Sequence, residues 1–317
     1  MRIIVVIFSL IAALSCSSKT ILDTISPDLE KEHINICVLG NSYSNDSFCY
    51  VPFILKDYGI TCNIHIYYRG SGSLHDLNEQ WLEDDMYGLA DLDGREHVRF
   101  HYSIDTRTDN RWNKEKTMSA NDIVSLKKWD IISLQQGGNR AKDLDSYNPY
   151  LTEIISKIDS MCNYSYSLAW FMAYNGATEN DNEGSINTQK IIYEAAKFDM
   201  VFPVATAVFI AQERNELNIL GDSTYKNMYY SDNIHLQEGL PCYLASLAIV
   251  QALLDKYLPG TSVFGNQVRP TQEWIEHINA ITPNGRSIGV TEDNCCLAQK
   301  IAIIANLFNF SIYSDFK

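Results

Sequence analysis

The sequence predicts an α/β protein in which a mostly parallel sheet of about five strands lies between two layers of helices. Short apolar runs rich in β-branched residues alternate along the chain with segments of helical pattern, an order typical of parallel strands joined by helical crossovers. The strand runs show little apolar–polar alternation, as expected for strands covered on both faces. About 300 residues remain after an N-terminal leader, enough for one large domain.

The individual elements follow from these patterns. The strands are expected at 34–39, 62–67, 130–135, 164–170 and 200–204, and the intervening helices at about 50–58, 119–128, 148–161 and 187–197. Pro52 and Gly59 stand where a first turn and a helix end favour these residues, and Pro241 and Pro259-Gly260 bound a further helix in the same way. The alternation predicts a three-layer α/β/α sandwich of the flavodoxin-like kind.

The interval 76–118, rich in acidic residues and tyrosine, interrupts this alternation. Within it, 98–105 and 111–117 are predicted to pair as a hairpin across Asp109-Asn110. We interpret the interval as a surface insertion between the second and third core strands that lies close enough to the strand ends to wall a cleft. With no internal repeat in the sequence, residues 32–317 are expected to form a single domain.

Residues 1–16 have the pattern of an export signal. The apolar run from Ile3 to Leu14 is too short to span a bilayer but fits a signal-peptide core. The following Cys16 ends a stretch that resembles a bacterial lipobox, although leucine is more usual where Ala13 stands. We therefore expect an exported protein, lipid-anchored in the periplasm or outer membrane of a Gram-negative bacterium, with residues 17–31 as a tether. Ordinary signal cleavage is the alternative.

Composition excludes some classes of function. The formal net charge of −14 argues against nucleic acid as a partner, and contact with a membrane is expected through the lipid anchor alone. Seven cysteines remain after Cys16, so an oxidising compartment would leave at least one thiol free. Their spacings match no metal site, and neither a metal nor another cofactor is expected.

Two short motifs could carry chemistry. Ser42 follows the strand 34–39 and Gly40, at the carboxyl end of a strand, where open α/β sheets bind ligands. A serine hydroxyl needs a neighbouring base, which His235 could supply, with Asp232 fixing the imidazole tautomer. The alternatives are a turn or N-cap serine and a solvated surface loop.

Four blocks in this order resemble the SGNH (GDSL-like) hydrolase superfamily, specifically an exported branch of undefined activity from polysaccharide-degrading Gram-negative bacteria. They are Gly40-Asn41-Ser42-Tyr43-Ser44, Gly70-Ser71-Gly72-Ser73, Gln135-Gln136-Gly137-Gly138-Asn139 and Asp232-Asn233-Ile234-His235. Two positions depart from the usual pattern. Asn41 stands where aspartate is common, and Arg140 where an aspartate often follows the third block.

The resemblance implies a serine hydrolase with Ser42, Asp232 and His235 as catalytic residues. It also implies an oxyanion hole made by the N–H groups of Ser42 and Gly72 and the amide of Asn139, with Gly70 and Gln136 as possible alternates. By analogy with exported relatives, the expected reaction removes acetyl or other short acyl groups from a glycan or a smaller ester.

Two other classes of function stay open. One is a non-catalytic glycan-binding lipoprotein on the same fold, and the other is an exported lipase or thioesterase. Aromatic residues could wall a sugar site or simply pack in the interior; they are Trp81, Trp112, Trp170 and Tyr102. The helical stripe Leu297, Ile301, Ile304 and Phe308 is expected to pack on the sheet rather than line an acyl pocket.

Overall fold

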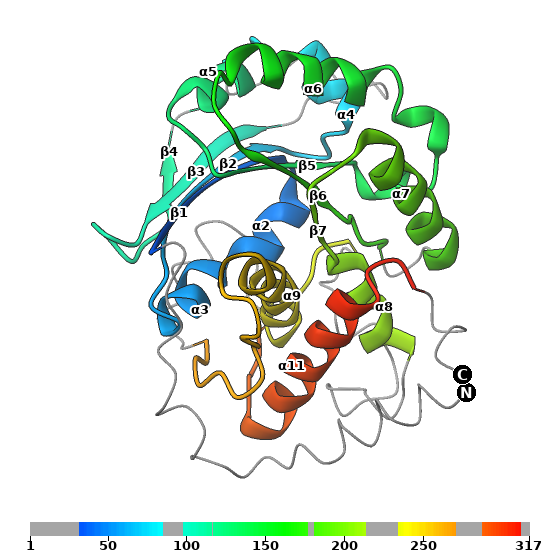
Figure 1. The fold of residues 1–317 in the computed structure, drawn as a ribbon. Coiled ribbons are helices and arrows are strands. Elements are labelled where there is room, and N and C mark those ends of the chain that lie inside the picture. The colour runs from blue at the N-terminus through cyan, green and yellow to red at the C-terminus, as the bar shows by residue number, and fades with distance from the viewer. Residues whose placement is uncertain are drawn as a thin grey trace.

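The computed structural model describes residues 32–84, 98–115, 117–176, 181–213, 234–270 and 287–311. A seven-stranded sheet runs through its centre in the order β4-β3-β2-β1-β5-β6-β7 (Figure 1). Its strands are β1 (His33–Gly40), β2 (Thr61–Arg69), β3 (Arg99–Asp105), β4 (Asn113–Glu115), β5 (Ile131–Gln135), β6 (Ser167–Phe171) and β7 (Met200–Phe202). A separate parallel pair joins β8 (Glu238–Gly239) to β9 (Ser287–Ile288).

The five strands β2, β1, β5, β6 and β7 are parallel to one another. In chain order they are arranged 2-1-3-4-5, which is the flavodoxin-like arrangement. The α/β class, the five parallel strands and the hairpin between 98 and 117 are thus confirmed. Strands β1 and β5 are almost completely buried, which explains their continuous apolar sequences.

Helices cover both faces of the sheet (Figure 1). One layer contains α4 (Leu74–Glu79), α5 (Ala120–Ser125) and α6 (Tyr150–Met161), and the other contains α2 (Ser42–Phe48), α3 (Val51–Asp57) and α9 (Leu240–Tyr257). The remaining helices are α7 (Asn182–Ala196), α8 (Val204–Glu213) and α11 (Glu292–Leu307), with 3-10 turns η1 (Gly138–Arg140) and η2 (Leu144–Ser146). Helix α9 is buried from Leu240 to Leu254, because α2, α3, α8 and α11 all pack around it.

The structure differs from the sequence-based expectation in three places. The hairpin β3–β4 is not separate from the core but extends the main sheet antiparallel to β2, because the backbone of that edge strand is free to pair. Helices α2, α4 and α8 were not predicted. Helix α11 packs against α9 and α8 rather than on the sheet, and its fully buried face includes Cys295, Ala298 and Ile301.

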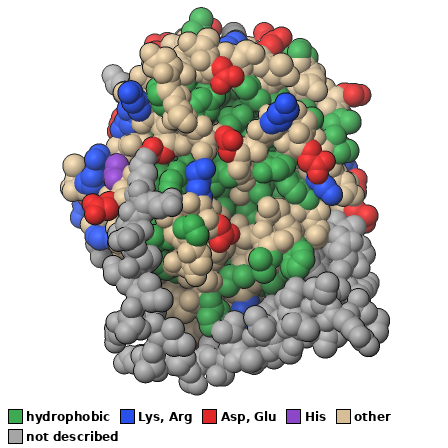
Figure 2. Space-filling model, in the orientation of Figure 1, with side chains coloured by type: hydrophobic (Ala, Val, Ile, Leu, Met, Phe, Trp, Pro, Cys, Tyr) green, Lys and Arg blue, Asp and Glu red, His purple; other side chains and the backbone are tan. Residues whose placement is uncertain are grey.

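None of the helices in the described ranges is both long enough and apolar enough to cross a membrane. On the face drawn in Figure 2, acidic and basic side chains are interspersed among hydrophobic ones.

The expected signal segment with Cys16, the tether 17–31 and the expected catalytic residue Asp232 lie outside the described residues.

Candidate active site at the carboxyl ends of β1 and β5

The candidate site lies where the strand order reverses. Strands β1 and β5 are neighbours, but the chain continues from β1 to β2 on the other side, so β1 and β5 form the topological switch point of the sheet. Ser42 follows β1 after Gly40 and Asn41, and the segment from Gln136 to Asn139 follows β5. Two of the motifs predicted from the sequence therefore meet at one edge of the sheet.

Asn41 is buried and organises the start of α2. Its Oδ1 accepts hydrogen bonds from the N–H of Tyr43 at 3.0 Å and from Nε2 of Gln135 at 2.5 Å. Its Nδ2 donates to the carbonyl of Gly72 at 2.9 Å, and Gln135 Oε1 accepts from the Ser44 hydroxyl. Position 41 thus needs a donor as well as an acceptor, which an ionised aspartate cannot provide. This network accounts for asparagine at the position where the motif that this segment resembles usually has aspartate.

Ser42 is the first residue of α2 and is half-buried. Its N–H has no acceptor within the helix, because the first N–H groups of any helix lack an intrahelical partner. Within the described part of the chain, its hydroxyl makes no hydrogen bond. The hydroxyl and the N–H of Ser42 are therefore both available to a ligand at the carboxyl ends of β1 and β5.

His235 reaches the same region from the other end of the chain. It is half-buried, and its ring lies edge-on to that of Tyr43, with the ring centroids 6.4 Å apart. Tyr43 in turn stacks on Tyr174 at a centroid distance of 4.2 Å. No hydrogen bond joins His235 to the Ser42 hydroxyl in this structure, although such bonds often tighten only when substrate is bound.

A residue that sequence reasoning missed holds the histidine segment in place. Asp46, buried on α2, accepts the N–H of Leu236 at 3.1 Å and the hydroxyl of Tyr174 at 2.8 Å through the same carboxylate oxygen. Burial and the Asp46 carboxylate raise the pKa of Tyr174 well above its usual value, so its hydroxyl keeps the proton that it donates. The residue after His235 is thereby fixed to the helix that starts at Ser42.

Of the expected oxyanion donors after β2, neither glycine N–H is free. The N–H of Gly72 donates to the carbonyl of Arg69, and that of Gly70 donates to the carbonyl of Val98, both at 3.0 Å. Gly72 instead contributes its own carbonyl, which accepts from Asn41.

The two candidates after β5 differ in the same respect. Gln136 is buried, and its amide nitrogen donates to the Ser146 carbonyl and hydroxyl, while its oxygen accepts the N–H groups of Leu74 and Gly137. Gln136 therefore fixes the loop and has no donor left for a ligand. Asn139 is exposed, and its amide has no partner within the described residues, so it remains available.

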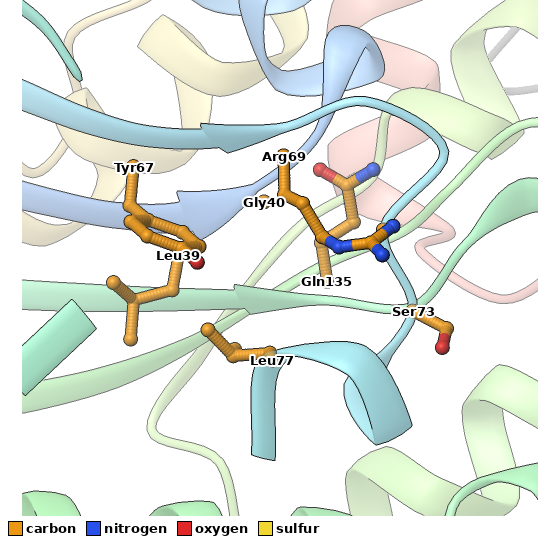
Figure 3. A pocket seen from close by; sticks show the side chains of 8 residues that line it. Leu39, Gly40, Tyr67, Arg69, Ser73, Leu77 and Gln135 are labelled. Atoms are coloured by element: carbon orange, nitrogen blue, oxygen red, sulfur yellow. The ribbon is translucent and has the colours of Figure 1, made fainter. Parts of the chain in front are cut away.

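A small cavity adjoins the Asn41 network (Figure 3). The Tyr67 ring and the Leu77 side chain enter it from β2 and α4. Its volume is about 10 Å³, the room that a single water molecule needs. The cavity is lined by Leu39, Gly40, Tyr67, Arg69, Gly72, Ser73, Leu77 and Gln135. It is too small for an ester substrate, which would have to approach Ser42 from its solvent-exposed side.

The aromatic residues considered for a sugar platform serve packing instead. Each is 6% exposed or less: Trp81, Trp112, Trp170 and Tyr102. Trp112 even uses its indole N–H to hold the carbonyl of Cys49 at 3.0 Å. Among the residues described, no group of three or more His, Cys, Asp or Glu side chains is arranged to hold a metal ion.

The fold resembles that of a solved protein. A crystal structure of a DUF4886 family protein from Bacteroides uniformis superposes with a TM-score of 0.67 at 18% sequence identity, covering 90% of this chain and all of the other. The likeness establishes the fold. No protein-family model and no curated protein matches the sequence.

Proposed function

We propose that this chain is a serine esterase of the SGNH type that removes acetyl or other short acyl groups from a carbohydrate. The observation that carries the proposal is that helix α2, which begins with Ser42, also binds the segment of His235. Ser42 begins α2, its hydroxyl makes no hydrogen bond to any of the described residues, and Asp46 on the same helix holds the segment of His235. The proposed nucleophile and the proposed base, from distant parts of the chain, thus lie at one edge of the sheet.

In this mechanism His235 accepts the Ser42 proton as the hydroxyl attacks the ester carbonyl, and later returns it to the leaving alcohol. Asp232 is proposed to orient the imidazole. The N–H of Ser42 and the amide of Asn139 are the available donors for the developing oxyanion. The glycan as substrate rests on the resemblance and on the expected export.

The proposal is tested by hydrolysis of a short aryl acetate and of acetylated glycans, using the chain without residues 1–16. We expect Ser42→Ala and His235→Gln each to lower kcat/KM by about 10³ or more. The matched controls are Ser160→Ala and His75→Gln, since both residues lie on helices of the opposite layer. Turnover that is equal in wild type and Ser42→Ala contradicts the proposal.

A non-catalytic glycan-binding protein is the second candidate. One observation favours it: the N–H groups of Gly70 and Gly72 are already bonded, which leaves the oxyanion hole with fewer donors than the related motif implies. Glycan binding by both wild type and Ser42→Ala, without measurable hydrolysis by either, would favour this candidate. A preference for long-chain acyl esters would instead favour a lipase or thioesterase.

A further inference from the structure

The segment that follows α2 is joined at several points to the first turns of α9. The Ser246 hydroxyl donates to the Ser47 carbonyl at 2.7 Å and accepts the Tyr50 N–H at 3.2 Å. The Tyr50 hydroxyl accepts the N–H of Gly239 at 3.1 Å, and its ring lies edge-on to that of Tyr243. Hydrogen bonds between backbone and side-chain groups thus hold together two segments that lie about 190 positions apart in the sequence.

Two cysteines lie at the centre of this junction. The Cys49 thiol donates to the Asp46 carbonyl at 3.1 Å, and the Cys242 thiol donates to the Leu236 carbonyl at 3.6 Å. Because Asp46 also binds Leu236 directly, the two thiols are anchored on residues that touch each other. Burial raises the pKa of Cys242 well above its usual value, and the nearby Cys49 raises it further. Cys242 precedes Ser246 by one helical turn, so it lies on the face of α9 that contacts the segment of Cys49. Both cysteines are free in this structure.

We propose that Cys49 and Cys242 form a disulfide bond when the chain folds in the presence of a disulfide donor. Each thiol gives up its hydrogen, one S–S bond forms, and the two electrons and two protons reduce the donor disulfide to two thiols. The reaction belongs to folding, because both cysteines are at most 1% exposed once the structure has closed. The raised pKa of the buried Cys242 thiol further disfavours the thiolate that exchange in the folded state would need.

The bond would lie directly beneath the candidate site. Cys49 follows the helix that starts at Ser42, and Cys242 is the third residue of the helix that follows the His235 segment. Oxidation would therefore tie together the two segments that the proposed chemistry brings into contact. The disulfide itself is independent of the proposed function and can be tested whatever the chain hydrolyses or binds.

The test uses the full chain refolded from urea in a mixture of oxidised and reduced glutathione or, in parallel, in dithiothreitol. After acid quenching and denaturation, free thiols are alkylated and counted by intact mass, and peptides are mapped without reduction. The reduced chain should take up eight alkyl groups, one for each cysteine. The oxidised chain should contain a peptide pair linked through Cys49 and Cys242, and it should melt at a higher temperature than the reduced chain.

Cys49→Ala and Cys242→Ala should each abolish the linked pair and the rise in melting temperature. Cys62→Ala is the matched control, because Cys62 is equally buried and lies away from the junction on β2; it should keep both. Oxidised wild type with neither thiol in a disulfide, or with either one linked to a different cysteine, would overturn the proposal. Since the map of the wild type decides this alone, poor folding of a variant does not obscure the result.

Discussion

The carboxylate of Asp46 accepts the backbone N–H of Leu236 at 3.1 Å across 190 residues of sequence. This bond fixes the segment of His235 to the helix that begins with Ser42. Because the same carboxylate oxygen also accepts the Tyr174 hydroxyl, one buried side chain joins α2, the end of β6 and the start of α9. The relative placement of the candidate nucleophile and base therefore depends on a residue that is neither.

Asp46→Ala should destabilise the protein and displace the histidine segment. The substitution leaves the Leu236 N–H and the Tyr174 hydroxyl buried without an acceptor, and each such loss costs roughly 1–3 kcal/mol. Asp46→Asn keeps an oxygen acceptor at the same place and should be milder. Urea unfolding measures the free energy of unfolding, and the pH dependence of the proposed esterase turnover tests the effect on His235. If the free energy of unfolding of Asp46→Ala equals that of wild type, the two hydrogen bonds to Asp46 do not stabilise the fold.

Asn41→Asp should be damaging although it restores the residue usual in the related motif. An ionised carboxylate cannot donate to the Gly72 carbonyl, and its oxygen would face that carbonyl oxygen in a buried site. We expect a loss of roughly 1–3 kcal/mol in stability, together with lower turnover. Thermal unfolding and aryl acetate hydrolysis check this, with the exposed Asn110→Asp as control. Unchanged behaviour of the variant would mean that the network around residue 41 is dispensable.

Gly138→Ala should disturb the candidate site through Tyr43. A Cβ at position 138 would lie 2.8 Å from Cζ of the Tyr43 ring, which is closer than real Cβ contacts allow. The ring must then move, and its contacts with Tyr174 and His235 are lost. We expect turnover to fall by more than tenfold. Gly289→Ala, where a Cβ would meet nothing within 4 Å, is the control. Equal activity in the two variants would contradict this role of the Tyr43 ring.

Stability should fall as the pH decreases below 6.5 because of a buried histidine pair. His65 Nδ1 lies 2.8 Å from His101 Nε2. Burial, with smaller contributions from the charges of His101 and Lys127, lowers the pKa of His65 to about 3. The unfolded chain then binds the proton more readily than the folded chain between pH 6.5 and 3, so the stability present above pH 6.5 is lost across that window.

Urea unfolding at several pH values between 6.5 and 4.5 measures this effect while most carboxylates stay ionised. Each buried histidine can contribute a slope of at most about 1.4 kcal/mol per pH unit. His65→Gln should reduce the slope, while His75→Gln, on the partly exposed α4, should keep it. A slope that is the same in His65→Gln and wild type would assign the pH dependence to other groups.

The sequence predicted the strands well because burial on both faces leaves a local mark. The apolar runs from Ile34 to Leu39 and from Ile131 to Leu134 are continuous, so adjacent residues are enough to recognise each run as a strand. Helices α4 and α8 escaped prediction for the opposite reason. Helix α4 has only six residues and depends on its Ser73 capping box. Helix α8 is apolar over most of its length, so it showed no amphipathic pattern beside the strand that precedes it.

The sequence by itself determined the fold class, the positions of the parallel strands along the chain and the choice of Ser42 and His235 as candidates, because each rests on a short-range pattern or on a local motif. Only the tertiary structure decided which polar groups near them are free. It showed that the Gly72 N–H and the Gln136 amide are already bonded, and that Asp46 binds the segment of His235 to α2. Hydrogen-bond partners separated by tens to hundreds of residues leave no periodic signal, so they emerge only when packing brings the segments together.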